Sequence, residues 1–342
     1  MLRRWTILLV AVVLVLLAIA LIRVLSKRAA LRGDAEAATA VAGAAAAAAV
    51  PAPVFDDPFW KHWGDGRAEL AGYDLVYPRY GEPRRGTAVT IFVTETFSNA
   101  LRVKSDPGKH PVADEFPVMK LNLVQDFPTG IYDYNLLTSA FVALAPVNGR
   151  PAGSATKVSF SAQEWCGHVY GQLLFDHGAA RLTSHSYFDG EADRDERLEV
   201  QDDALDEDAL MLWARGLAAP LVDPGQSREA PLVRSLRLAR MTHQPVTVER
   251  ATLARAAAPH TVTVPAGSFE ARACTVTVGA NRTWTFEVET VAPHRLLSWE
   301  CSNGEKAQLL AAERLVYWKM NGSGFRDAVA KLGLKPRPER TP

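Results

Sequence analysis

The sequence lacks the charge pattern of a nucleic-acid-binding protein. Its 342 residues include 38 Lys and Arg and 38 Asp and Glu, so the formal net charge is zero. No stretch after residue 53 is dense in Lys and Arg. Neutralisation of phosphates by such residues supplies much of the affinity for DNA and RNA. We therefore expect no nucleic acid among the partners of this protein.

Several catalytic and cofactor-binding motifs are also missing. The chain has no phosphate-cradling Gly-rich loop, no Gly-x-Ser-x-Gly elbow and no His-Glu-x-x-His motif. The acidic residues 189–196 begin like a calcium-binding loop, but Arg194 stands where that loop needs Gly, and Val200 stands where it needs a carboxylate. These absences favour a protein that is not an enzyme, and they predict neither a cofactor nor a metal site.

An uncharged apolar run near the N-terminus predicts a membrane anchor. Residues 5–22 follow Arg3 and Arg4, contain no charged side chain, and exceed the apolar core of a cleaved signal peptide, which is the alternative. Residues 1–32 are interpreted as a single-pass anchor with basic flanks, and the Ala- and Pro-rich residues 33–53 as a flexible tether. Since a lone N-terminal anchor usually serves an exported domain, we expect an inner-membrane protein with a periplasmic body.

The pattern changes after the tether to short alternating runs separated by turn residues. Residues 54–320 are interpreted as one antiparallel β-domain, followed by a C-terminal tail at 321–342. Many strands with one apolar face each predict curved sheets that form a sandwich or a half-open barrel. An acidic first turn favours one helix at 203–217. The strands expected in the first half lie at 73–80, 87–97, 118–126, 131–144, 156–164, 165–175 and 181–188.

The C-terminal half allows individual residues to be paired. Strands are expected at 270–278, 282–289, 295–301 and 306–314, separated by turns with Gly, Asn or Pro. This register places Cys274 opposite Phe286 and Cys301 opposite Trp284. The two cysteines then lie on the first and third strands, farther apart than a disulfide can bridge. We therefore expect both to be buried free thiols.

Several motifs resemble those of an uncharacterised family of exported or lipid-anchored bacterial proteins. They are FWKHWGDGRAEL (59–70), RYGE (79–82), TGIYDY (129–134) and QEWCGH (163–168). The family has no established activity. Because this sequence lacks the acylated cysteine of the lipid-anchored members, the resemblance favours a helical anchor.

The motif VPAGSFE (264–270) and the strands after it are similar to another group of bacterial envelope β-proteins. That group is in turn similar to half-open barrels that carry lipoproteins or lipids. The resemblance implies an envelope location and a binding function, by analogy of fold alone.

One cysteine offers a catalytic interpretation. If residues 165–175 form a strand, Cys166 and His168 project from one face and can pair as nucleophile and base, with Asp189 or Glu164 orienting the imidazole. The alternative is that these residues belong to a polar face of the sheet with no catalytic role. Zinc would need His177 and His185 as well, but these residues lack the short paired spacing of a zinc site.

Three aromatic residues are candidates for ligand contact. Trp284, Phe286 and Trp299 would share one apolar sheet face, where they contact either a hydrophobic ligand or only one another as core residues. Together with the anchor, they predict a membrane-anchored, non-enzymatic envelope protein that binds a hydrophobic ligand such as a lipid, or a partner protein. The alternative is a thiol-dependent hydrolase or transferase that uses Cys166 and His168.

Overall fold

The computed structural model describes residues 50–337. Residues 50–342 form a compact unit of their own, separate from residues 1–49, and we call this unit the body. The predicted membrane anchor and most of the predicted tether lie outside the described residues. Between residues 50 and 337, no helix is long and apolar enough to cross a membrane.

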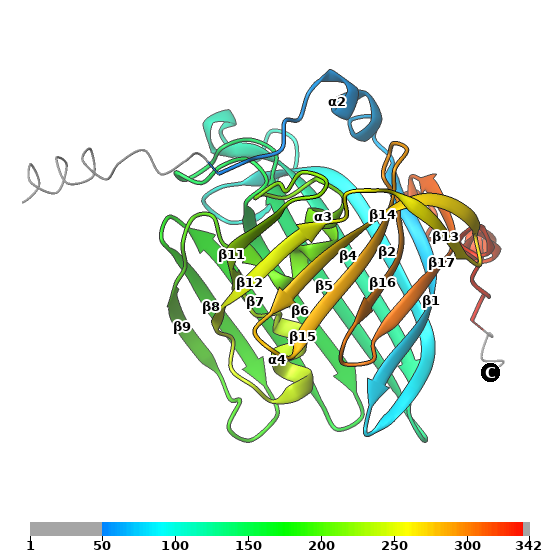
Figure 1. Ribbon diagram of the computed structural model, residues 1–342. Helices are drawn as coiled ribbons and strands as arrows, with labels where there is room; N and C mark the ends of the chain where they lie inside the picture. Colours follow the sequence, from blue (N-terminus) through cyan, green and yellow to red (C-terminus); the bar gives the residue numbers. More distant parts are fainter. Residues whose placement is uncertain (1–49, 338–342) are drawn as a thin grey trace, which may run out of the picture. The chain divides into compact units, whose positions relative to one another are not determined.

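The body is built on one large sheet of 17 strands (Figure 1). The strands of its first half are β1 (Ala68–Arg79), β2 (Glu82–Ser98), β3 (Val103–Lys104), β4 (Glu115–Pro128), β5 (Asp133–Ala143), β6 (Ala155–Glu164), β7 (Gly167–Asp176), β8 (Ala179–Ser186) and β9 (Arg194–Glu199). Those of the second half are β10 (Leu205–Asp206), β11 (Ser227–Val233), β12 (Val248–Arg255), β13 (His260–Val264), β14 (Gly267–Val278), β15 (Arg282–Glu289), β16 (Leu296–Cys301) and β17 (Lys306–Leu315).

The helices are few and short. They are α2 (Asp57–Trp63), α3 (Leu210–Ala214) and α4 (Leu236–Thr242), with the 3-10 helices η1 (Val112–Asp114), η2 (Glu207–Ala209), η3 (Tyr317–Lys319) and η4 (Ser323–Leu332). The prediction of a fold dominated by β-strands is therefore confirmed for the described residues, which contain more short helices than the one or two expected.

Pairing runs through the sheet in the order β9-β8-β7-β6-β5-β4-β2-β1-β17-β16-β15-β14-β12-β11. The short strands β3, β13 and β10 pair with β2, β14 and β11, and the β10–β11 pair is parallel. The first and last long strands thus meet in the middle of the sheet. Its two ends, β9 and β11, come round toward each other (Figure 1). Among the described strands no ladder joins β9 to β10 or β11, and we call this opening the seam.

Strict alternation of side chains explains why one face of the sheet is buried. In β4, Met119, Leu121 and Leu123 are buried while the residues between them are partly exposed, as expected for a strand with one face on a core. A single curved sheet encloses this core, so the prediction of curvature holds and two separate stacked sheets do not form. We call the enclosed surface the concave face.

The β1–β2 hairpin turns more tightly than the sequence suggests. Tyr80 and Gly81 alone connect the strands, both with positive φ, at 56° and 76°. That geometry is typical of a two-residue type I′ turn, whose twist matches the flanking strands. Strand β2 therefore begins at Glu82, five residues before the start of the strand expected at 87–97.

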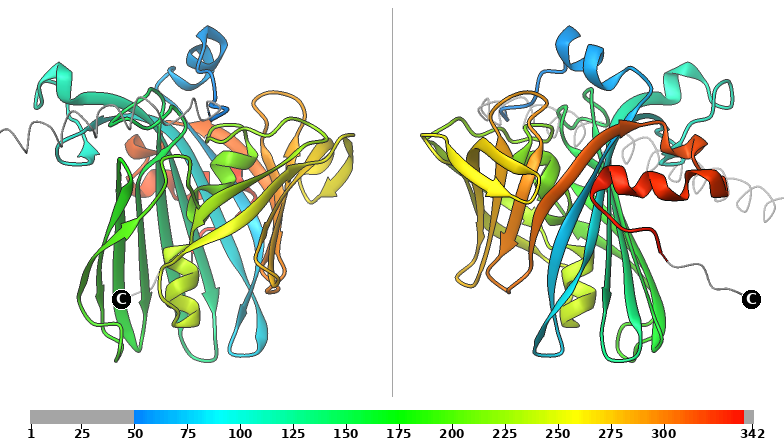
Figure 2. Two further views of the ribbon diagram at one scale, coloured as in Figure 1. Left: turned by 60° about the vertical axis from the view of Figure 1, so that its left-hand side comes forward. Right: turned by 90° about the vertical axis from the view of Figure 1, so that its right-hand side faces the viewer.

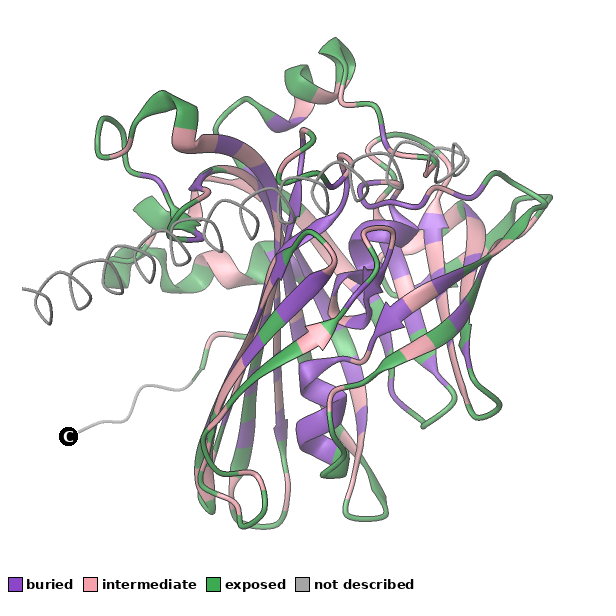
Figure 3. Cartoon of the chain, turned by 90° about the vertical axis from the view of Figure 1, so that its left-hand side faces the viewer, coloured by how far each residue is buried: buried purple, intermediate pink, exposed green. Residues whose placement is uncertain are grey.

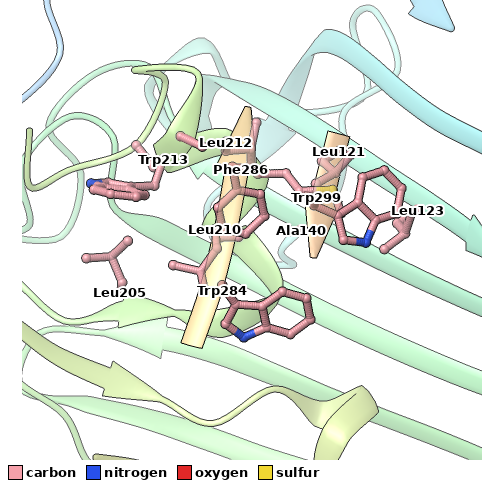
Figure 4. Close-up of a cluster of buried hydrophobic side chains, with 14 of the residues drawn as sticks. Leu121, Leu123, Ala140, Leu205, Leu210, Leu212, Trp213, Trp284, Phe286 and Trp299 are labelled. Carbon is pink, nitrogen blue, oxygen red and sulfur yellow. The ribbon is translucent and has the colours of Figure 1, made fainter. Parts of the chain in front are cut away.

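The concave face is filled by short helices rather than left open. Figure 2 shows α3 and α4 between strands β6–β9 on one side and strands β11–β16 on the other. Every residue of α3 is buried, and its side chains lie beside Trp284 and Phe286 of β15 (Figure 4). Of the helix predicted at 203–217, only Leu210–Ala214 is α-helical. We call η2, α3 and α4 together the plug.

Buried ion pairs join the plug to the sheet. Arg215, which caps α3, donates two hydrogen bonds to Glu69 of β1 at 2.6 and 3.1 Å. Arg237 of α4 donates to Glu305, beside β17, at 2.6 Å. All four side chains are almost fully buried. Because a buried charge without its partner is strongly destabilising, these pairs favour one position of the plug.

The segment predicted as a C-terminal tail is ordered as far as it is described. Helix η4 lies on the outer face of the sheet (Figure 2), where Leu332 is buried with Leu70 and Val93. Gly72 lies directly below, and a Cβ atom there would come within 2.2 Å of the carbonyl oxygen of Leu332. The absence of a side chain at Gly72 thus permits this close contact.

Candidate functional site

The candidate site is a pocket of about 420 Å³ that lies beside the seam. Its walls are β6, β7 and β8 on one side and α4 on the other, and the chain before β9 and the residues after α4 complete it. Figure 3 views the body from this side and shows α4 between the two ends of the sheet. We call this cavity the seam pocket.

The floor of the seam pocket is apolar. It is formed by residues from β6, β7, β8 and α4 and from the segment before β12: Phe160, Val169, Leu182, Leu236 and Val246. Gly171 of β7 belongs to the same floor, and a Cβ atom there would only touch Leu236 and Ser184 at 3.7 Å. Glycine at this position therefore leaves space that a larger side chain would occupy.

The mouth of the seam pocket is charged. Asp189, Glu191, Arg194 and His243 line it. His243 ends α4 with a left-handed φ of 55°, and its Nδ1 forms a short hydrogen bond with Glu191. An apolar floor beneath a charged mouth suits a molecule with an apolar part and a polar end.

Arg240 marks the boundary between the floor and the mouth. Its side chain is 4% exposed, and its Nη2 lies 3.7 Å from Oε1 of Glu164, whose side chain is 2% exposed. The guanidinium lies 3.8 Å from the ring centroid of Phe188, a cation–π contact. Its Nε has no hydrogen-bond partner, so a buried cation with unused donor capacity lines the pocket.

The structure does not place the proposed catalytic residues together on one strand face. The β6–β7 hairpin turns at residues 165 and 166, so Cys166 lies in the turn, and the strand predicted at 165–175 begins at Gly167 instead. His168 is exposed on β7, and Asp189 lies at the mouth of the seam pocket. Tyr170 of β7 pairs with His185 of β8.

The surroundings of Cys166 disfavour its thiolate. Its backbone N–H donates to Oε2 of Glu164 at 2.7 Å. The pKa of the Cys166 thiol is raised, chiefly by its hydrogen bond to the Glu164 carboxylate, with smaller contributions from desolvation and from the carboxylate charge. A reactive cysteine needs the opposite, an electropositive site that lowers its pKa.

The three aromatic candidates lie in the core. Trp284, Phe286 and Trp299 are at most 3% exposed and pack near α3 on the concave face (Figure 4). Trp284 donates its indole N–H to Glu207 at 2.8 Å, and Trp299 donates to Glu305 at 3.1 Å. None of the three lines the seam pocket, because the plug covers the sheet where they stand.

The strand register expected around the two cysteines of the C-terminal half is confirmed. Cys274 pairs with Phe286, and Cys301 pairs with Trp284, and both thiols are buried and free. Burial raises the pKa of Cys301 to about 11.

The histidines considered for zinc have other partners. His177 lies 2.7 Å from Asp202 and His185 lies 3.0 Å from Asp193. In residues 50–337, no group of three or more His, Cys, Asp and Glu is arranged to hold a metal ion.

Sequence reasoning missed most of the seam pocket. Helix α4 was not predicted, and its Arg240 gave no sign that it would be buried. One signal was available: Gly171 interrupts the apolar alternation between Val169 and Leu173, and an interior glycine in a strand often marks a place where something approaches closely.

Comparisons with known proteins give little beyond this geometry. No protein-family model matches the chain, and no curated protein matches it. Among solved structures it is similar to the crystal structure of a β-barrel-like protein of the domain of unknown function DUF1849 from Brucella abortus, with 11% sequence identity and a TM-score of 0.43 over 73% of this chain and 98% of that one.

Proposed function

We propose that the body binds an amphiphilic ligand, an acyl chain with a polar end, in the seam pocket. The observation that carries this proposal is the position of the pocket, with an apolar floor over β6, β7 and β8 and a charged mouth beside His243 and Glu191. The rest of the concave face is occupied by the plug. The seam pocket thus offers space for an acyl chain, whereas the rest of the described core is packed with side chains.

The proposal includes a membrane location. The uncharged residues 5–22 would anchor the protein in the cytoplasmic membrane with the body on the periplasmic side, which rests on the sequence alone. An amphiphilic ligand suits that location, because membranes are where acyl chains are abundant. No observation favours a partner protein or a thiol-dependent reaction over this function.

A fluorescent fatty acid tests the proposal. Dansylundecanoic acid should bind the protein with enhanced emission. Gly171→Val should weaken the binding by at least about tenfold, or about 1.4 kcal/mol, because the new side chain fills the floor. Ser161→Val is the matched control, since Ser161 lies in β6 between the buried residues Phe160 and Ala162 and is partly exposed. Equal binding by the two variants would contradict the proposed site.

Native mass spectrometry supplies an independent measurement. A lipid-sized mass that copurifies with the wild-type protein and is lost from Gly171→Val would support the proposal and identify the ligand class. Retention of that mass by Gly171→Val would place the ligand elsewhere.

A further inference from the structure

Exposed aromatic side chains gather at one end of the body. Tyr80, Trp165 and Tyr187 are 56%, 73% and 72% exposed, and Ile131 is 82% exposed. Tyr132 is partly exposed beside Ile131. We call these five side chains the aromatic rim. Large apolar side chains that are exposed as a group, unlike isolated ones, call for an explanation.

The rim is continuous although its residues come from four different turns. The hydroxyl of Tyr132 donates to that of Tyr80 at 3.3 Å, and the ring of Tyr132 stacks on Trp165 with centroids 5.9 Å apart. Tyr187 packs on Gly167, next to the turn that bears Trp165, since a Cβ atom at Gly167 would come within 2.4 Å of its ring.

The four turns share one end of the body because neighbouring strands are antiparallel. They connect β1 to β2, β4 to β5, β6 to β7 and β8 to β9, at the lower end in Figure 1. The ring of Tyr187 contacts that of Phe188, with centroids 5.5 Å apart, and the ring of Phe188 contacts that of His243, with centroids 5.9 Å apart. The rim thus leads directly to the mouth of the seam pocket.

We propose that the aromatic rim docks on the surface of a lipid bilayer. Trp and Tyr combine a large apolar ring with one polar group, and this combination favours the level of the lipid head groups. The rim side chains stand on separate turn tips, so they can enter a fluid interface without a matching groove on a partner. Docking would bring the mouth of the seam pocket to the bilayer.

The charges beside the rim indicate a zwitterionic lipid surface. Arg79 and Glu82 flank Tyr80, Asp133 follows Tyr132, and Asp189 is close to Tyr187. Arg79 is itself bonded to Tyr134 and to the carbonyl of Met241. With no excess of positive charge, docking should depend on apolar contact rather than on anionic lipids, and it should vary little with salt.

Cys166 provides a reporter within the rim. It is exposed, whereas Cys274 and Cys301 are buried, so a maleimide carrying the dye NBD should label it selectively in the full chain. We expect phosphatidylcholine vesicles to raise the NBD emission, and lipids brominated along the acyl chain to quench it. Tyr187→Ser combined with Ile131→Ser should reduce the quenching of the dye at Cys166 at least about tenfold.

The opposite end of the body supplies matched controls. Leu101 and Val112 are 62% and 86% exposed in the connection between β2 and β4, so Leu101→Ser combined with Val112→Ser removes similar apolar surface away from the rim. This variant should dock like the wild type. A second protein, Cys166→Ser with Val112→Cys, moves the dye to that end and should show no quenching.

The two dye positions separate docking of the rim from insertion of residues 5–22, because both proteins contain that segment. Equal quenching at the two positions, or none at Cys166, would overturn the proposal. The rim variants leave the floor of the seam pocket intact, so binding of dansylundecanoic acid tests the proposed function separately.

Discussion

Buried carboxylates gather where β10 passes into η2. Asp206 is fully buried and Asp208 is partly buried, and Oδ2 of Asp206 has no hydrogen-bond partner. Burial raises the pKa of Asp208 to about 6 and that of Asp206 well above its usual range, and repulsion between the two carboxylates adds to the shift of Asp206. The native state therefore holds protons that the unfolded chain releases near pH 4.

This shift predicts that Asp206→Asn stabilises the body, and more at pH 8 than at pH 5. Carboxyl groups with raised pKa values favour the native state at low pH, and their contribution is lost as the pH rises through the window from about 4 to about 6 for Asp208, and beyond it for Asp206. We expect a gain on the order of 1 kcal/mol at pH 8, measured by urea unfolding at both pH values. Asp74→Asn, at an exposed site on β1, is the control; a loss of stability at pH 8 for Asp206→Asn would contradict this account.

Cys166 should react slowly with iodoacetamide at neutral pH. Its raised pKa leaves little thiolate, and Glu164→Gln should speed alkylation by removing the carboxylate that causes most of the shift. Mass spectrometry of the labelled peptide gives the rates, with circular dichroism to confirm folding. Asp189→Asn should leave the rate unchanged. Rapid labelling that His168→Ala abolishes would instead support the thiol-dependent alternative.

At the level of secondary-structure elements, what could be predicted depended on how locally each element is determined. Strand β15 matches its expected bounds, 282–289, because Trp284, Phe286 and Val288 alternate strictly between clear turn residues. Helix α4 could not be foreseen, because its Arg237 and Arg240 are buried against Glu305 and Glu164, which lie far away in the chain. Periodicity reports local order, whereas such pairs depend on the complete fold.

The contact beneath η4 gives a prediction for a single glycine. Gly72→Ala should destabilise the body by about 1–3 kcal/mol and loosen η4, because the new Cβ atom would meet the backbone of Leu332. Limited proteolysis should then cut within residues 323–332 before the sheet unfolds. Gly130→Ala, which meets no atom within 4 Å, should show neither effect. Unchanged proteolysis of Gly72→Ala would mean that η4 is not held there.

The ion pair between α3 and β1 gives a second prediction about an element. Arg215→Met should cost about 3–5 kcal/mol by leaving Glu69 buried and unpaired, and adding Glu69→Gln should restore part of that loss. The comparison is Arg250→Met, which breaks an exposed pair with Glu229 of similar length, 2.9 Å, and should cost at most about 1 kcal/mol. Guanidinium unfolding measures all three. Equal costs for the two single variants would show that burial of the pair is unimportant.

For the whole molecule, the sequence predicted the curved sheet but not the place of the pocket. Alternation identified the concave face, and the aromatic residues Trp284 and Trp299 marked it as a place for a ligand. The plug occupies that surface instead. The seam pocket lies where β7, α4 and the chain before β9 come together. These segments are distant in the sequence, so no local pattern predicts that they form a pocket.

The separation of the body from residues 1–49 predicts independent folding. The protein that begins at Val50 should unfold cooperatively at the same temperature, within about 2 °C, as the full chain in the same detergent, because its core lies wholly within the body. Calorimetry measures both. A markedly lower temperature for the shorter protein would show that the N-terminal residues stabilise the body.

The pairing of β1 with β17 has a consequence for synthesis on the ribosome. Ala68 lies opposite Leu315, so β1 leaves the ribosome long before its partner exists. Until then a central strand has one free edge, which is open to pairing with other chains. Contacts between such distant residues also make folding slow. The pairing can form only after residue 315 has left the ribosome, and we expect the nascent chain to need a chaperone until β17 is made.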